Sequence, residues 1–428
     1  IGDKGMNAST NYAALLADAI AINGTVTAAN AAIGAGNFTY NNQTGEMNSL
    51  GKTATVMQMI FPEYSIDISN LGGIKANSIS MVGNTLGLGV RNKGTITANA
   101  ALAMTSYGSL VNEGSINTNG LMAKMASLGD MKNTGTINST AYVTQLSSVG
   151  TLTNEGTIAS SKQIAISATG DLVNAGTMKG TQLLSVASGG NLTTRKGSNT
   201  VSDGQLAVSA NNIDNAGSMR GNITYVEFSG DKLKVTGELR GHSTLTVQSK
   251  KDDKVNSGLI YNTGSISGND VTIITNGNLD QEGNIIGQNS LSIKTNVLDN
   301  VYYIYGKSLN IESNYVRNRA TIDGYNNTIS AANGILNEGQ ISASGDLTLK
   351  TLNNANITNY NTIKANGSLT MTTGTVKNGG YRCGFLNLAT CGKGSISANK
   401  LVLNSYHNYA SEMGGQQQYK YAEINTIR

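Results

Sequence analysis

A short motif recurs along most of the chain, and its spacing constrains the fold more than any other feature. The motif is Asn, any residue, Gly, a polar residue and then Ile or Met. Copies begin at Asn92, Asn112, Asn133, Asn154, Asn174, Asn215, Asn262 and Asn337, with degenerate copies from Arg195, Val235, Gln281, near Asn300, Asn318, Asn359 and Asn378. The period is roughly 20 residues, which is typical of a solenoid of stacked coils.

Between the motifs, apolar residues alternate with polar ones. Ile164, Ile166 and Ala168 are two residues apart, and Leu172 continues the apolar set before the next motif. This period of two indicates short strands. A coil of about 20 residues then holds two or three strands, each paired in parallel with the next coil. We therefore predict an all-β parallel β-helix with an Ile, Leu and Val interior.

The motif residues suit corners between strands. Asn tolerates the left-handed conformation and bonds its own backbone, and Gly adopts a positive φ without steric cost, so we expect both to form the turns. Leucine-rich repeats share the period, but their Leu-rich series and helical return segment are absent. Proline, which interrupts a ladder, occurs only at Pro62.

Composition supports an ordered chain and excludes some functions. The 428 residues include 52 glycines and only 13% charged side chains, yet Ile, Val, Leu and Thr recur throughout, unlike a disordered chain. A net charge of +4 forms no basic stripe, so nucleic acid is not an expected partner. No apolar run reaches the roughly 18 to 20 residues that span a bilayer.

Two segments depart from the repeat. Asn11 to Ile22 has helical spacing, so a short helix is expected there. Lys250 to Lys254 is a charged run in the widest gap between motifs, and we expect it to be a solvated loop outside the coil.

β-Helices also serve as enzymes, whose sites need clustered carboxylates. Here Glu113, Glu155 and Glu338 all occupy the variable position of the motif, where exposed corners are expected, and the adjacent acids Asp252 and Asp253 lie in the charged run. His242 and His407 are the only imidazoles. We therefore predict no enzyme, no cofactor and no metal site.

The N-terminal part carries a family resemblance. Ile1-Gly-Asp-Lys-Gly-Met, Tyr12 to Asn23, Ile66 to Asn77 and Val82 to Ile96 closely resemble, in this order, the end of the secretion domain of filamentous haemagglutinins and contact-dependent-inhibition proteins. Residues 85–378 look like the haemagglutinin repeats that follow it. On this resemblance, residues 1–84 end the secretion-type β-helix domain, residues 85–378 form the stalk, and the β-helix is right-handed.

The resemblance also implies a location and partners. Such two-partner exoproteins are secreted through a dedicated outer-membrane transporter, remain on the bacterial cell surface and hold a receptor-binding region away from it. The chain is accordingly expected to be a monomeric filament segment that projects a receptor-binding region and a toxin toward neighbouring bacteria. The alternative is a haemagglutinin-like adhesin for host cells or biofilms. Any signal peptide is expected upstream of Ile1.

Cys383 and Cys391 are the only cysteines, separated by seven residues. In a secreted chain they are expected to form a disulfide, the alternative being two buried thiols.

Tyrosines accumulate in the second half, where 13 of the 18 lie at or beyond Tyr225. Tyrosine offers a large rigid contact area with a polar tip. Two groups are candidates for partner binding, against the alternative that the rings only pack: Tyr302, Tyr303 and Tyr305, which replace an expected corner, and Tyr406, Tyr409, Tyr419 and Tyr421. The period fails after Asn378, so residues 379–428 are expected to form a transition segment that leads toward a receptor-binding region.

Overall fold

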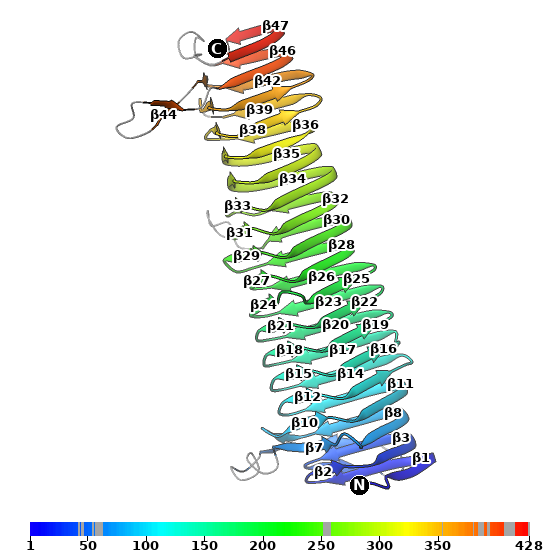
Figure 1. The fold of residues 1–428 in the computed structure, drawn as a ribbon. Coiled ribbons are helices and arrows are strands. Elements are labelled where there is room, and N and C mark those ends of the chain that lie inside the picture. Colours follow the sequence, from blue (N-terminus) through cyan, green and yellow to red (C-terminus); the bar gives the residue numbers. More distant parts are fainter. Residues whose placement is uncertain are drawn as a thin grey trace. The chain divides into compact units, whose positions relative to one another are not determined.

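The computed structural model describes residues 1–41, 43, 47–53, 55, 63–250, 258–352, 354–379, 381–383, 389–391, 394–405 and 416–426. In these residues every regular element is a β-strand, and successive coils pair in parallel as a β-solenoid (Figure 1). The chain divides into two units, residues 1–211 with 216–221 and residues 212–215 with 222–428. The predicted all-β parallel β-helix with coils of about 20 residues is confirmed.

In unit 1, a regular coil has three strands. In coils that carry the full motif, the first strand ends in the motif Asn, the second carries the motif Ile or Met, and the third closes the coil. The first strands are β2 (Ile20–Ile22), β7 (Tyr64–Ile68), β10 (Gly89–Asn92), β12 (Leu110–Asn112), β15 (Met131–Asn133), β18 (Leu152–Asn154), β21 (Leu172–Asn174) and β24 (Asn191–Thr194). The second strands are β13 (Ser115–Thr118), β16 (Thr136–Ser139), β19 (Thr157–Ser160), β22 (Thr177–Gly180) and β25 (Asn199–Ser202).

The third strands of unit 1 are β14 (Met122–Ser127), β17 (Val143–Ser148), β20 (Gln163–Ala168), β23 (Leu183–Ser188) and β26 (Gln205–Ala210). In the earlier coils one long strand runs through the second and third positions, as in β1 (Met6–Ala17), β3 (Thr25–Ala35), β8 (Gly73–Gly83) and β11 (Thr95–Ser106). Short pairs join β4 (Phe38–Tyr40) to β5 (Met47–Ser49) and β6 (Lys52–Thr53) to β9 (Thr85–Leu86).

Unit 2 contains both short and long strands. They are β27 (Asn212–Asn215), β28 (Ser218–Phe228, which begins in unit 1), β29 (Lys232–Val235), β30 (Glu238–Ser249), β31 (Leu259–Asn262), β32 (Ser265–Ile274), β33 (Leu279–Gln281), β34 (Asn284–Asn300), β35 (Tyr303–Asn318) and β36 (Thr321–Ala331). They continue as β37 (Ile335–Asn337), β38 (Gln340–Ala343), β39 (Leu347–Thr351), β40 (Asn356–Asn359), β41 (Thr362–Ala365), β42 (Ser368–Thr373), β43 (Thr375–Asn378), β44 (Tyr381–Cys383), β45 (Ala389–Cys391), β46 (Ser395–Ser405) and β47 (Gln416–Thr426).

The core is a set of columns, each built from one position of successive coils. Ile116 pairs with Ile137, Ile137 with Ile158, and Ile158 with Met178. Ile158 and Met178 are fully buried. Because the side-chain period of a strand is two, the alternating sequence sends every second side chain into this interior, as the sequence predicts.

The motif asparagines form a buried ladder that the sequence reading did not anticipate. In unit 1, the Asn112 side-chain amide donates to Oδ1 of Asn133 at 2.7 Å, and the Asn133 amide donates to Oδ1 of Asn154 at 2.8 Å. Unit 2 repeats the pattern from Asn318 to Asn337 at 2.8 Å and from Asn337 to Asn359 at 2.7 Å. Since these side chains are buried, each bond satisfies polar atoms that water cannot reach.

The expected corner conformation is wrong. Among the described residues, the one non-glycine with positive φ is Asn354, and the positive-φ glycines are Gly5, Gly36, Gly51, Gly87, Gly120, Gly197, Gly258 and Gly334. None of these belongs to a full motif copy, and only Gly197 belongs to a degenerate one, the copy from Arg195. At Gly135 a Cβ would overlap the carbonyl oxygen of Gly114, one coil earlier. The motif needs glycine because stacked backbones approach too closely for a side chain, and it needs asparagine because the side chain bonds between coils.

The helix expected from Asn11 to Ile22 is also wrong, because β1 and β2 occupy this segment. β1 pairs in parallel with β3, with Ala13 opposite Ala31 and Leu15 opposite Ile33. Parallel pairing with a neighbouring coil satisfies the backbone and overrides the weak helical preference of a run of small residues.

The charged run lies almost wholly outside the described residues, which resume at Gly258. Lys250, its first residue, forms an ion pair of 2.7 Å with Glu227. The loop predicted for Lys250 to Lys254, and the acids Asp252 and Asp253 within it, therefore stay predictions.

Residues 379–428 leave the regular coil only in part. β44 and β45 form an antiparallel pair at the side of the stacked coils of unit 2 (Figure 1). β46 then returns to the parallel ladder, pairing with β41 and β42, and β47 pairs with β46. The transition segment thus contains a hairpin followed by two further parallel strands. The parallel ladder continues across residues 84 and 378, where β8 pairs with β11 and β42 pairs with β46. The domain boundaries assigned at these two residues stay predictions.

The hairpin sets the register of the two cysteines. Cys383 lies opposite Ala389 and Cys391 opposite Tyr381, so the cysteines occupy a diagonal pair of positions. Their side chains lie outside the described residues. We predict a disulfide that adds roughly 2–3 kcal/mol locally by closing a loop of about nine residues. Thiol labelling of the native, unreduced chain should modify neither cysteine, and labelling after reduction should modify both. Modification of both without reductant would contradict the pairing.

Candidate binding surface

The column of motif glycines is interrupted in unit 2 by Tyr302 and Ala320, and again by Asn361. Gly264 and Gly283 are followed by Tyr302 and Ala320 before glycine returns at Gly339. At the intact part of the column, the backbone N–H of Asn284 donates to the Gly264 carbonyl at 2.9 Å. Where tyrosine enters, the corresponding bond from Tyr303 to Gly283 lengthens to 3.3 Å. Tyr302 is therefore a bulky aromatic side chain at a position that most coils fill with glycine.

Three tyrosines accompany this interruption. The Tyr302 side chain is 55% exposed. Tyr303 and Tyr305 lie two residues apart on β35, and their rings are nearly parallel, with an interplanar angle of 8° and centroids 6.4 Å apart. Burial raises the pKa of the Tyr303 hydroxyl, and the nearby Asp323 and Tyr305 add to this rise. Two rings of the first predicted tyrosine group, Tyr303 and Tyr305, thus stack on the strand that begins next to the exposed Tyr302.

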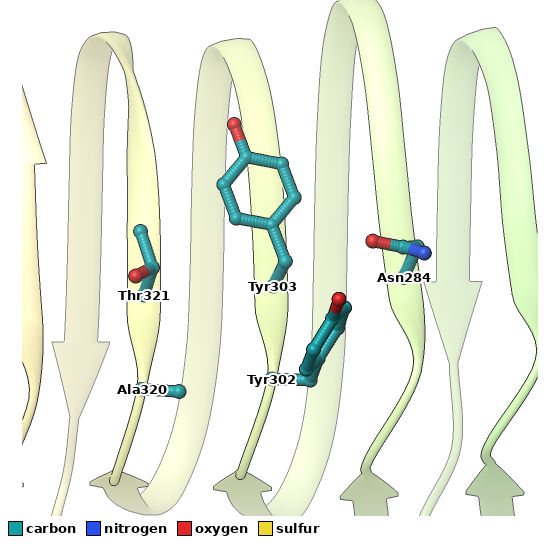
Figure 2. Close-up of a pocket in the computed structure, with 5 residues that line it drawn as sticks. All are labelled: Asn284, Tyr302, Tyr303, Ala320 and Thr321. Carbon is teal, nitrogen blue, oxygen red and sulfur yellow. The ribbon is translucent and has the colours of Figure 1, made fainter.

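A groove of ≈ 440 Å³ lies at the same place, lined by Asn284, Tyr302, Tyr303, Ala320 and Thr321. These residues come from three adjacent coils, because Asn284 pairs with Tyr303 and Tyr303 pairs with Thr321. Figure 2 shows the Tyr302 ring leaning toward the coil of Asn284, while the small Ala320 side chain stands beside the tyrosine coil. The groove therefore exists because a large residue is followed by a small one in the same column.

Two arginines near the groove are paired with acids. Arg319 donates two hydrogen bonds to the Asp299 carboxylate, one of them at 3.0 Å, and Arg317 donates to Glu338 at 2.8 Å. Both pairs connect adjacent coils. Exposed pairs of this kind contribute little to stability, but they leave the groove flanked by neutralised charge.

Asp280 is a partly buried acid of β33. Partial burial raises the pKa of its carboxyl group, the negative charges of Asp299 and Glu282 raise it further, and the positive charges of Lys232 and Arg319 oppose the rise. Since the folded-state pKa lies above the unfolded value, ionisation of Asp280 destabilises the fold as the pH rises through that folded-state pKa.

We therefore predict that Asp280→Asn increases hydrogen-exchange protection of β33 and β34 at pH 7. The gain should disappear at about pH 3, where the carboxyl group is protonated in both the folded and the unfolded state. Asp299→Asn is the control, because it removes the partner of Arg319 and should not increase protection. Equal protection of wild type and Asp280→Asn at pH 7 would count against the assigned pKa direction.

The second tyrosine group is only partly described. Tyr406 and Tyr409 lie outside the described residues. Tyr419 and Tyr421 belong to β47, where their backbones pair with Ala398 and Lys400. The partner-binding role predicted for this group stays a prediction.

The motif glutamates lie at corners, as expected, and each pairs with a cation on the preceding coil. Glu155 is 3.2 Å from Lys132, and Glu113 is 3.7 Å from Lys93. No group of three or more His, Cys, Asp or Glu residues suited to a metal was found among the described residues, which include His242 but not His407. Within the same residues, no helix is long and apolar enough to cross a membrane.

Sequence reasoning missed Asn284, Ala320 and Thr321. Their signal was available in principle, since aligning the motifs places Tyr302 and Ala320 in the glycine column. The turn interpretation of the motif concealed it, because that interpretation did not consider how closely the backbones of stacked coils approach.

The structure defines a parallel β-solenoid with one aromatic groove on the surface of unit 2. Over 58 residues, 13% of the chain, the sequence is 41% identical to a protein described as Toxin CdiA from Yersinia pestis. The matched residues amount to 2% of that protein, so the chain spans a small part of this relative. No family model matches the chain, and no solved structure matches it.

Proposed function

We propose that the chain is a stalk segment of a secreted filament on the surface of a bacterium, part of a contact-dependent-inhibition protein that projects a receptor-binding region and a toxin toward neighbouring cells. The observation that carries this proposal is the uninterrupted column packing, in which Ile116, Ile137, Ile158 and Met178 stack coil on coil. Such packing produces length without requiring a catalytic site. The partial match to Toxin CdiA supports the choice of family.

The proposed stalk is not an enzyme. Two carboxylates near the groove are engaged in ion pairs between coils, Asp299 with Arg319 and Glu338 with Arg317. These pairs neutralise groups that acid–base catalysis would need. The remaining partners of the proposal are an outer-membrane transporter during secretion and a receptor on the target cell.

Surface labelling of the intact protein in its own bacterium tests the location. Leu121 is 80% exposed, whereas Ile116 is fully buried. In otherwise unaltered protein, Leu121→Cys should react with a membrane-impermeant maleimide on intact cells, and Ile116→Cys should react no more than wild type. Deleting the gene of the partner transporter should abolish the Leu121→Cys signal. A signal that requires permeabilised cells would contradict a surface location.

Co-culture separates toxin delivery from adhesion alone. A strain with the intact protein should reduce the count of a neighbouring strain that lacks its immunity protein, and should spare the same strain when it carries that protein. Attachment to neighbours or host cells without any such reduction would favour the adhesin alternative, in which the solenoid presents a binding region only.

A further inference from the structure

The groove at Tyr302 is a departure from the repeat within the regular coils of the described part of unit 2. A glycine at this position would stack as Gly283 does. With tyrosine there, the hydrogen bond from the Tyr303 N–H to the Gly283 carbonyl is long, at 3.3 Å. The Tyr302 side chain is 55% exposed, so its packing in the protein does little to offset this. Places where a sequence breaks its own structural rule are commonly functional. We propose that this groove binds a neutral glycan chain, which goes beyond the proposed stalk role and does not depend on it.

The residues that line the groove suit a neutral ligand with many hydroxyl groups. Asn284 supplies a side-chain amide, Thr321 a hydroxyl and Tyr302 and Tyr303 phenol groups, so the groove offers both donors and acceptors (Figure 2). The tyrosine rings supply flat apolar faces against which the C–H face of a sugar ring packs. The lining contains no charged residue. An ionic ligand would thus find no counter-charge in the groove.

The spacing of the lining also suits a chain of sugars. Asn284, Tyr303 and Thr321 occupy matching positions of three adjacent coils, which follow one another at about 4.8 Å. This rise is comparable to the length of one pyranose unit. The parallel rings of Tyr303 and Tyr305 extend the surface along the strand direction of β35. A short oligosaccharide lying across the coils can therefore contact each coil with one unit.

A proline-rich peptide is the other ligand that aromatic grooves bind. Such peptides need an apolar slot for each proline ring, and Ala320 is the sole aliphatic side chain in the lining. The mixture of one amide, hydroxyl groups and exposed rings favours the glycan.

The test uses the full 428-residue chain and isothermal titration calorimetry. The probes are maltohexaose, cellohexaose and the hexamer of N-acetylglucosamine, with a decaproline peptide and an acidic hyaluronan hexamer for comparison. Wild type should bind at least one of the neutral hexamers. Tyr302→Gly restores the glycine column, so it should fold as well as wild type while weakening that binding about tenfold or more.

Tyr142→Ala is the matched control, because Tyr142 is an exposed tyrosine, 59% accessible, at another corner in unit 1. This variant should retain wild-type affinity. The proposal is overturned if none of the neutral hexamers binds, if Tyr302→Gly binds as tightly as wild type, or if decaproline or the acidic hexamer is the preferred ligand. Hydrogen exchange of β34 and β35 in Tyr302→Gly verifies that any loss of binding does not come from unfolding.

Discussion

Replacing Ile158 with aspartate is expected to destabilise the coils around β19 by at least about 4 kcal/mol, because it places a carboxylate in the solenoid interior. Ile158 is fully buried, and its column neighbours Ile137 and Met178 leave no polar partner at the matching positions. Burial would protonate the carboxyl group or expel it into solvent, and either outcome disrupts the pairing of β19 with β16 and β22.

The damage should remain local. In a solenoid each coil contacts mainly its neighbours, so stability is close to a sum of coil and interface contributions. Limited proteolysis and hydrogen exchange should therefore show loss of protection in β16, β19 and β22, while β39 and β42, many coils away, stay protected.

Ala159→Asp supplies the matched control. Ala159 is the next residue of the same strand and faces outward, so aspartate there remains hydrated. It should behave as wild type within about 0.5 kcal/mol. Wild-type protease resistance around residue 158 in Ile158→Asp would contradict the assignment of this column to the core.

The strand pattern was predictable because it depends on local alternation. Ile164, Ile166 and Ala168 identify one strand by their spacing, and the repeat of the motif fixes which coil each strand belongs to. The helix expected from Asn11 to Ile22 failed for the opposite reason. Its spacing is ambiguous between helix and strand, and pairing with β3, which decides the outcome, is a contact between residues distant in sequence.

The binding surface was predictable only in part. The tyrosines of residues 302–305 stand out by composition, but the groove depends on Ala320 and Asn284, which are ordinary residues in the sequence. They matter because the register places them beside Tyr302 and Tyr303. The sequence of one coil does not show which residues of the neighbouring coils lie beside it. That register is set when the coils stack.

The asparagine ladder could not be predicted from the sequence either. The motif shows that an asparagine recurs at the position of Asn133, but it does not show which groups the side chain bonds. Its side chain accepts a bond of 2.7 Å from Asn112 and donates one of 2.8 Å to Asn154. It also donates to the carbonyl of Thr157 at 3.2 Å. Asn133 is therefore a connection between three coils.

Asn133→Ala is accordingly expected to destabilise these coils by about 3 kcal/mol. The substitution leaves Oδ1 of Asn154 without its donor and removes the acceptor of the Asn112 amide, and each buried unsatisfied polar group costs about 1–3 kcal/mol. Asn138→Ala is the control, because Asn138 lies on the neighbouring strand β16 but is exposed. It should change the free energy of unfolding by no more than about 0.5 kcal/mol.

Replacing a ladder asparagine with an apolar residue should also reduce stability, as the first asparagine of the ladder illustrates. Asn92 pairs in register with Ile68, which has no side-chain donor, and Oδ1 of Asn92 is buried without a hydrogen bond. Asn133→Leu would create the same situation for Asn154 in the middle of unit 1. Hydrogen-exchange protection of β15, β18 and β21 should fall in both Asn133→Ala and Asn133→Leu. If both variants retain wild-type protection, the ladder contributes no stability.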